Sequence, residues 1–308
     1  MCANTYSGVK IVLTKVLYMN ITRSTLIHLR IPFSVFLMPI YWFALSLSPS
    51  AALWPAVLVF VVLHLLLYPA SNGYNSWFDK DEGSIGGVER PPSVTIDLYY
   101  VSLLFDALAL ALGFVIGWQF VVLLFVYGLV SKMYSHPAVR LKKMPIIGWL
   151  AAGIFQGAFT YVMVFMAVNG VDATVVLDPK VALPAALSTF MLFGSYPMTQ
   201  VYQHEEDGRR GDETLSRKLG LLGTFHFTAL MFTGATAGFC WYYAHYYSLT
   251  TALLFVLFLG PVLAYFGRWY LRVRRNAAEA NFKNTMRLNI VSSLCLSAFF
   301  IFFMLMRF

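Results

Sequence analysis

One acidic, glycine-rich segment of this sequence, residues 75–91, carries side chains that could bind a metal ion. It follows a long apolar run. If the segment begins as the end of a helix, Asn75 and Asp79 are four residues apart and share a face. Asp81 and Glu82 follow within the next turn. Oxygen donors of this kind suit a hard cation such as Mg²⁺.

A second acidic segment lies at residues 203–215, again after an apolar run. Helical spacing would put Gln203, Glu206 and Asp207 on one face. Mg²⁺ prefers to share its ligand shell between carboxylates and substrate phosphates, and Lys and Arg bind the same phosphates. Two such faces with cations nearby are therefore typical of a site that receives a diphosphate.

A basic stretch at residues 132–143 supplies such cations. It contains Lys132, Tyr134, Arg140 and Lys142. By themselves these residues are typical of the positive anchors at the end of a membrane helix. Beside two metal-binding faces they gain a second use, because nearby cations neutralise the charge that builds up as a diphosphate departs.

The composition indicates a membrane protein of many spans. Of its 308 residues, 59% are apolar and 12% are charged, and the mean hydropathy is +0.69. A helix needs roughly 17 to 25 apolar residues to cross a hydrocarbon core of about 30 Å. Runs of this length predict an all-α, polytopic bundle of nine transmembrane helices. They lie near residues 25–48, 51–74, 95–116, 118–134, 145–169, 181–203, 219–243, 248–270 and 284–306.

The positions of the positive charges predict the topology. Of 22 Lys and Arg residues, 20 fall in the amino-terminal segment and after predicted helices 2, 4, 6 and 8, which leaves Lys180 and Arg307. Cytoplasmic connections carry such an excess. We therefore predict an integral membrane protein, in contact with membrane lipid, whose amino terminus and acidic segments are cytoplasmic and whose carboxyl terminus is on the opposite side. The net charge of +8 reflects this topology rather than affinity for nucleic acid.

The amino-terminal residues 1–24 contain an apolar run that is too short and too polar to span, and no small-residue cleavage site follows it. We predict an interfacial amphipathic helix here. A single transmembrane domain would then occupy residues 25–308. His28 and Arg30 open its first span, and we expect both side chains to snorkel to the lipid headgroups.

One carboxylate, Asp106, lies inside the third predicted span. An unpaired charge in hydrocarbon is costly, so this side chain should face the bundle interior or a wet cavity. A hydrogen bond to a neighbouring helix and a role in the cavity both fit this position.

Three motifs together resemble those of the UbiA family of intramembrane prenyltransferases, over nearly the whole chain. The family's pattern Asn-Asp-x-x-Asp-x-x-x-Asp is similar to residues 75–83, which Arg90-Pro91 follows. Its pattern Tyr-Ser-x-Pro-x-x-Arg-Leu-Lys is similar to residues 134–142. Its second acidic pattern, Asp-x-x-x-Asp followed by Gly-x-x-Thr-Leu and Leu-Gly, is similar to residues 203–220.

The chain departs from the family at three motif positions. Ser76 and Gly83 stand where the first motif has aspartates, and Gln203 stands where the second motif has its first aspartate. Other carboxylates within a helical turn could replace the missing ones. The candidates are Asp81, Glu82 and Glu206.

The resemblance implies a role for each matching residue. It implies catalytic roles for Asp79, Asp207, Tyr134 and Arg140. It implies substrate binding, to the diphosphate above all, by Asn75, Lys142, Gln203 and Arg90. It implies Mg²⁺ binding by Asn75, Asp79, Asp81, Glu82, Glu206 and Asp207.

The resemblance also implies a divergent prenyltransferase with a central cavity capped on the cytoplasmic side. Its donor would be a polyprenyl diphosphate, its cofactor Mg²⁺, and its acceptor an aromatic or lipid-like molecule. Aromatic faces stabilise the allylic cation that such a donor forms, and 17% of the residues are Phe, Trp or Tyr. The alternative is a non-catalytic membrane protein that binds or transports a lipid or an ion. Charges gathered at one face, rather than near the bilayer midplane, favour the enzyme.

The charge distribution predicts the outcome of a topology experiment. Reporter fusions placed after Lys80, Lys143 and Arg210 should report the cytoplasm, and a fusion at residue 308 should report the opposite side. The measurement is the activity of paired reporters that work on only one side of the membrane. A cytoplasmic carboxyl terminus would rule out nine spans.

Overall fold

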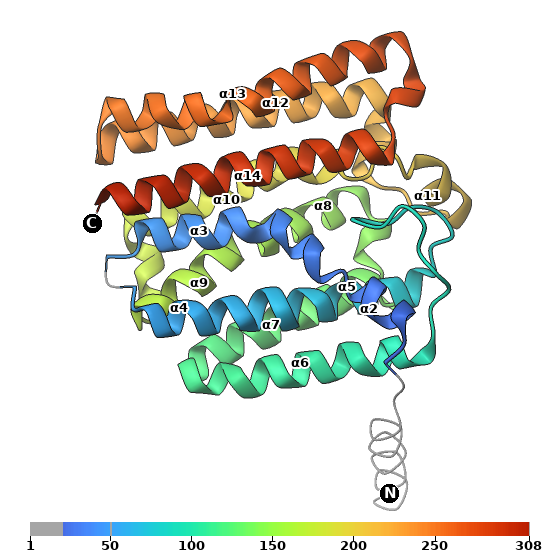
Figure 1. Cartoon of the computed structure of the whole chain (residues 1–308), viewed down its shortest axis with the longest axis horizontal. Helices are drawn as coiled ribbons and strands as arrows, with labels where there is room; N and C mark the ends of the chain where they lie inside the picture. Colours follow the sequence, from blue (N-terminus) through green and yellow to red (C-terminus); the bar gives the residue numbers. More distant parts are fainter. Residues whose placement is uncertain (1–20, 50, 308) are drawn as a thin grey trace, which may run out of the picture. The chain divides into compact units, whose positions relative to one another are not determined.

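The computed structural model describes residues 21–49 and 51–307, which are mainly helical (Figure 1). Nine helices in these two ranges are long and apolar enough to cross a membrane. They run Arg23–Leu47, Leu53–Asp79, Ile96–Ile116, Trp118–Ser135, Pro145–Asn169, Pro179–Met198, Leu215–Tyr246, Leu249–Arg275 and Phe282–Arg307. The predicted all-α class and the nine spans are confirmed, whereas the predicted central cavity stays a prediction. Most of the predicted amino-terminal helix, residues 1–20, lies outside the described residues.

Among the described residues, five spans are formed by one continuous helix each. These helices are α6 (Ile96–Ile116), α7 (Trp118–Ser135), α10 (Pro179–Met198), α13 (Leu249–Arg275) and α14 (Phe282–Arg307). The seventh span, α12 (Leu215–Tyr246), is kinked at Gly220, which has φ 70° and ψ 175°. The first span joins α2 (Arg23–Leu29), the 3₁₀-helix η1 (Ile31–Leu37) and α3 (Met38–Leu47). The second joins α4 (Leu53–Phe60), the π-helix η2 (Val61–Leu67) and α5 (Tyr68–Asp79). The fifth joins α8 (Pro145–Ile154), the π-helix η4 (Phe155–Phe159) and α9 (Thr160–Asn169). Short helices η3 (Leu141–Lys143), η5 (Ala173–Leu177), α11 (His204–Arg210) and η6 (Ala277–Glu279) lie in the connections.

The chain forms two compact units. Unit 1 contains the described residues of 21–34 and 61–139, and unit 2 contains those of 35–60 and 140–307. The first acidic segment therefore belongs to unit 1. The second acidic segment belongs to unit 2, together with Arg140. The single domain expected over residues 25–308 stays a prediction.

In unit 1, α2 is held against α5 and the loop that follows it. His28 Nε2 donates to the Pro92 carbonyl oxygen at 2.8 Å, and Arg30 Nη2 donates to the Asn72 carbonyl oxygen at 3.2 Å. His28 is only 1% exposed. The expectation that these two side chains snorkel is therefore wrong, because backbone carbonyl oxygens of α5 and of the loop after it offer them partners inside the protein.

An ion pair joins α6 and α7, which lie side by side in Figure 1. The Asp106 carboxylate pairs with the Lys132 ammonium, and the two side chains are 16% and 18% exposed. The ammonium also lies 5.3 Å from the centroid of the Tyr74 ring on α5. Asp106 thus faces a neighbouring helix, as the cost of a bare charge in hydrocarbon requires.

In unit 2, η4 approaches α10 closely. A π-helical turn leaves backbone donors without their usual helical partners, and hydrocarbon offers no water to replace them. The Ala158 amide donates to the Thr189 hydroxyl at 2.9 Å. A Cβ atom on Gly157 would lie 2.6 Å from Thr189 Cα, so only glycine permits this approach.

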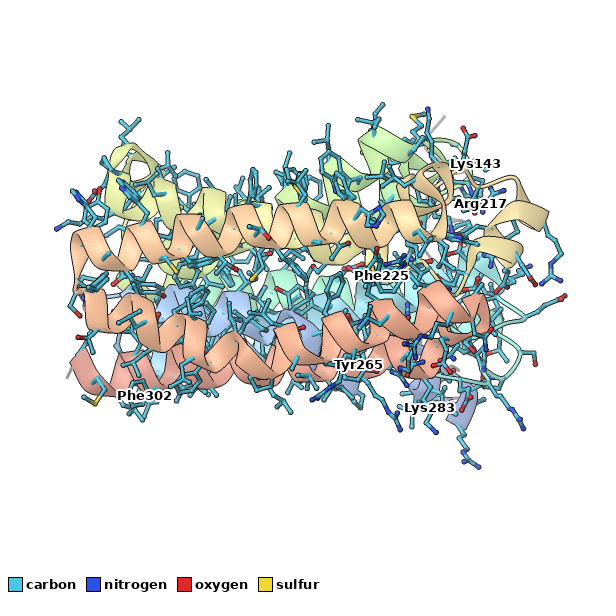
Figure 2. All side chains as sticks on the ribbon, turned by 90° about the horizontal axis from the view of Figure 1, so that it is seen from above. Lys143, Arg217, Phe225, Tyr265, Lys283 and Phe302 are labelled. Atoms are coloured by element: carbon cyan, nitrogen blue, oxygen red, sulfur yellow. The ribbon has the colours of Figure 1, made fainter. Side chains whose placement is uncertain are left out.

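Unit 2 is aromatic inside and charged at one end. Phe43 packs on Phe300 with ring centroids 4.6 Å apart and on Tyr161 at 5.2 Å, and all three rings are buried. Figure 2 shows Lys143, Arg217 and Lys283 toward one end of the helices and Phe302 toward the other. This polarity agrees with a charged face at one membrane surface.

The ion pair in unit 1 predicts a loss of stability. Asp106→Leu should lower the melting temperature in detergent, because Lys132 would keep its charge without a counter-ion, and breaking a buried pair costs about 3–5 kcal/mol. The double variant Asp106→Leu with Lys132→Met is the control and should melt above the single variant. Equal melting of wild type and the single variant would show that the pair contributes nothing.

Candidate active site

The first acidic segment begins on the last turns of α5. Asn75 and Asp79 lie four residues apart on this helix and are both half-buried, as the sequence predicts. The helix ends at Asp79, because Lys80 adopts the left-handed conformation with φ 49° and its N–H binds the Ser76 carbonyl oxygen at 3.0 Å. Two side-chain oxygen donors are thus presented at one helix end.

Asp81 and Glu82 lie beyond this helix end. The left-handed residue Lys80 turns the chain, and the loop that follows has only an isolated bridge between Ile85 and Val88. The prediction that Glu82 shares a helical face with Asp79 is therefore wrong, whereas metal binding by Asp81 and Glu82 stays a prediction. Glu82 is exposed, and so is Arg90, the predicted substrate-binding residue of this loop.

Tyr134 lies at the end of α7 in unit 1 and is half-buried. Two residues later, the His136 ring packs on Phe78 of α5 with centroids 5.1 Å apart. The end of α7 therefore lies beside the end of α5 that carries Asp79. This contact brings the start of the basic motif next to the first acidic motif within unit 1.

The second acidic segment forms a helix of its own in unit 2. The sixth span ends at Met198, and α11 begins at His204 after Gln203, whose carbonyl oxygen accepts from the Asp207 amide at 2.9 Å. The sixth span therefore ends five residues before its predicted end at residue 203, and the acidic face lies on a separate short helix. Asp207 is 9% exposed. Glu206 forms an ion pair with Arg210 at 2.8 Å.

Asp212, which the sequence analysis did not single out, binds two cations of the basic stretch, Arg140 and Lys142. Its carboxylate accepts from Arg140 Nε at 3.1 Å and from Arg140 Nη2 at 2.9 Å. Lys142 Nζ lies 3.8 Å from Asp212 Oδ2. Nothing in the local pattern marks this residue, because its partners lie about 70 positions earlier in the chain.

Two backbone contacts tie Asp212 to the second acidic helix and to α12. The Asp212 amide donates to the Asp207 carbonyl oxygen at 2.9 Å, across Gly211 at φ 70°. Arg217 Nη1 donates to the Asp212 carbonyl oxygen at 2.5 Å. Arg140 and Lys142 are therefore linked through one residue to the helix that carries Asp207.

A second link between α11 and α12 is a histidine that the sequence analysis also missed. His204 Nε2 lies 2.7 Å from the Ser216 hydroxyl, and Ser216 lies 3.1 Å from the Thr224 hydroxyl. Burial, together with the positive charge of Arg217, lowers the pKa of His204 below its ordinary 6.5. The neutral imidazole is thus the form that this packing favours.

These motifs lie in a region that matches a known family. The model of the UbiA prenyltransferase family matches residues 36–305. The chain belongs to this family. Membrane prenyl transfer is the general activity that UbiA membership supports. Comparison with the curated proteins finds no match.

Solved UbiA homologues have the same fold. The homologue from Aeropyrum pernix K1, solved in its apo form, has a TM-score of 0.66 and 20% identity, over 88% of this chain and 98% of that one. The homologue from Archaeoglobus fulgidus, solved with GPP and Mg²⁺, has a TM-score of 0.63 and 17% identity, over 91% of this chain and 99% of that one. The same values hold for the Archaeoglobus structure with DMAPP and Mg²⁺.

The donors of this UbiA chain suit Mg²⁺ in type. Among residues 21–49 and 51–307, no three His, Cys, Asp or Glu side chains gather in a group that could hold a metal. Mg²⁺ does not need such a cage, because it keeps several waters and is bound through one or two carboxylates plus substrate phosphates. Asn75 and Asp79 in unit 1, and Asp207 in unit 2, fit this mode. Ser76, at a family aspartate position, has a buried hydroxyl with no hydrogen-bond partner in the described part of the chain.

The lowered pKa of His204 predicts how stability depends on pH. Between the ordinary pKa of 6.5 and the lower folded value, the unfolded chain binds more protons, so the contribution of His204 to stability falls as the pH drops. His204→Asn should remove this contribution, so its melting temperature should fall less than that of the wild type between about pH 7 and pH 5. Melting curves over this range measure both slopes. Parallel slopes would contradict the assignment.

Proposed function

We propose that this chain is an integral membrane prenyltransferase that uses a prenyl diphosphate as donor and Mg²⁺ as cofactor. The acceptor would be an aromatic or lipid-like molecule. Family membership supports the reaction class. The Archaeoglobus fulgidus homologue solved with GPP, with DMAPP and with Mg²⁺ supports the donor and the metal.

The observation that carries this proposal is the basic pair of unit 2. Arg140 and Lys142 are held at one carboxylate, Asp212, whose amide binds the backbone of the metal-ligand candidate Asp207. Paired cations next to an oxygen-rich helix match the needs of a diphosphate, which carries several negative charges.

In the reaction, the bond between the prenyl C1 atom and the diphosphate oxygen breaks, and the oxygen keeps the electron pair. The acceptor then forms a bond to C1 and loses a proton. Arg140 and Lys142 would neutralise the charge of the departing diphosphate, and the Tyr134 hydroxyl would bind one of its oxygens. Bound Mg²⁺ would supply electrostatic stabilisation of the same oxygens.

The metal would be held by the oxygen donors of the two acidic segments. Asn75, Asp79 and Asp207 are the principal candidates. Gln203, Glu206, Asp81 and Glu82 remain proposed helpers. The ion pair of Glu206 with Arg210 favours a secondary role for Glu206, since a carboxylate shared with a guanidinium gives less charge to a metal.

A pyrophosphate-release assay tests the proposal. Purified protein in detergent is incubated with dimethylallyl or geranyl diphosphate, Mg²⁺ and a membrane lipid extract as the source of acceptor. The proposal expects release that depends on protein, Mg²⁺ and extract together. Binding of a diphosphate with no release would favour the non-catalytic binding protein or transporter.

A Mg²⁺ titration separates the roles of the carboxylates. Asp79→Asn and Asp207→Asn should each abolish activity, because a lost carboxylate weakens both the metal and the diphosphate that it bridges. Glu206→Gln should stay active but need more Mg²⁺ for half-maximal rate, whereas Gln203→Asp should need less. Normal rates and normal Mg²⁺ dependence in both aspartate variants would refute the metal site.

A further inference from the structure

We propose that Asp212 is a positioning residue, which orients Arg140 and Lys142 for the diphosphate of the donor. This role rests on the proposed function. Asp212 matches no acidic position of the family motifs quoted above, and it is the buried carboxylate to which both cations bind.

The hydrogen bonds between Arg140 and Asp212 fix the orientation of the Arg140 guanidinium. Asp212 binds the Nε and Nη2 atoms of Arg140 with its two oxygens at 3.1 and 2.9 Å. A bidentate pair of this kind sets the plane of the guanidinium as well as its position. Arg140 itself has φ 47°, so its backbone also turns sharply before η3. The Asp212 carboxylate thereby holds the guanidinium in one orientation.

The same carboxylate holds two like charges together. Arg140 Nη2 and Lys142 Nζ lie 2.9 and 3.8 Å from the same oxygen, Oδ2 of Asp212. Two cations that both contact one atom repel each other strongly unless an anion lies between them. Without Asp212, the two side chains would separate, and a diphosphate would have to bring them together again.

The exposed fractions of the three side chains show that the two cations are more accessible to an anionic ligand than the carboxylate is. The Asp212 side chain is 2% exposed, against 15% for Arg140 and 11% for Lys142. The carboxylate thus lies behind the cations, where it is shielded from an incoming anion. It can orient them without presenting its own negative charge to the diphosphate.

The backbone gives Asp212 a fixed position relative to the acidic helix. Its amide binds the Asp207 carbonyl oxygen, and its carbonyl oxygen accepts from Arg217. The distance between Asp207 and the basic pair therefore depends on the six residues from 207 to 212. Asp212 thus connects the metal-ligand candidate Asp207, through its backbone, to Arg140 and Lys142, through its side chain.

The experiment measures donor binding and stability together. Inorganic pyrophosphate and geranyl diphosphate, each with Mg²⁺, are titrated into purified full-length protein by calorimetry, and each variant is also melted. The variants are Asp212→Ala, Asp212→Asn, Asp212→Glu, Arg140→Ala and the double variant Asp212→Ala with Arg140→Ala. Glu213→Ala is the matched control, because Glu213 is the exposed carboxylate next in the chain.

Asp212→Ala and Asp212→Asn should each weaken the binding of both ligands by about 10- to 100-fold, since a hydrogen bond to a charged group contributes about that much. Asp212→Glu should recover part of the affinity. The loss of affinity in the double variant should be smaller than the product of the two single losses, because Asp212 acts in part through Arg140. Glu213→Ala should bind like the wild type.

Three results would overturn the proposal. Unchanged or tighter binding in Asp212→Asn would mean that the carboxylate does not orient the cations. Multiplied losses in the double variant would mean that it acts independently of Arg140. A loss that follows the melting temperature, with no recovery in Asp212→Glu, would mean a purely structural role. A wild type that binds neither ligand would instead refute the proposed function, and the positioning role with it.

Discussion

The structure depends on one constraint, which is that hydrocarbon offers no partner for a backbone N–H or C=O group. The nine spans within residues 21–49 and 51–307 meet it as helices. Where η4 departs from the α-helical pattern, Thr189 of α10 supplies the acceptor for the Ala158 amide. The need to satisfy one backbone amide thus brings η4 and α10 close together, and this close approach requires glycine at position 157.

The same constraint governs the charges, which differ in purpose between the two units. In unit 1, Asp106 and Lys132 pair between two membrane helices, and the pair removes two costly charges from hydrocarbon. In unit 2, the Asp212 carboxylate contacts two cations, Arg140 and Lys142, that come from a distant part of the chain. The first pair joins two membrane helices, whereas the second joins two connections between helices.

The departures from the UbiA motifs gain a physical meaning from the local structure. Ser76 stands where the first family motif has an aspartate. It is buried on the helix that presents Asn75 and Asp79, and its side chain brings a hydroxyl in place of a carboxylate. Gln203 precedes a short helix whose Glu206 is engaged by Arg210. Fewer carboxylates mean that the diphosphate and water must complete more of the shell of a bound Mg²⁺. Binding of metal and donor would then be strongly coupled in this member of the family.

The sequence by itself determined the helical class and the nine spans of the described residues. The length of an apolar run is a local property, and the thickness of the bilayer sets the length that a spanning helix needs. It also located Asn75 and Asp79 on one helical face, which depends only on spacing. Tertiary structure alone decided the rest. The left-handed turn at Lys80 removed Glu82 from that face. Arg30 and His28 form hydrogen bonds to the carbonyl oxygens of Asn72 and Pro92 inside the protein. Asp212 meets Arg140 from 72 positions away, and no local pattern encodes a contact made by the packing of distant segments.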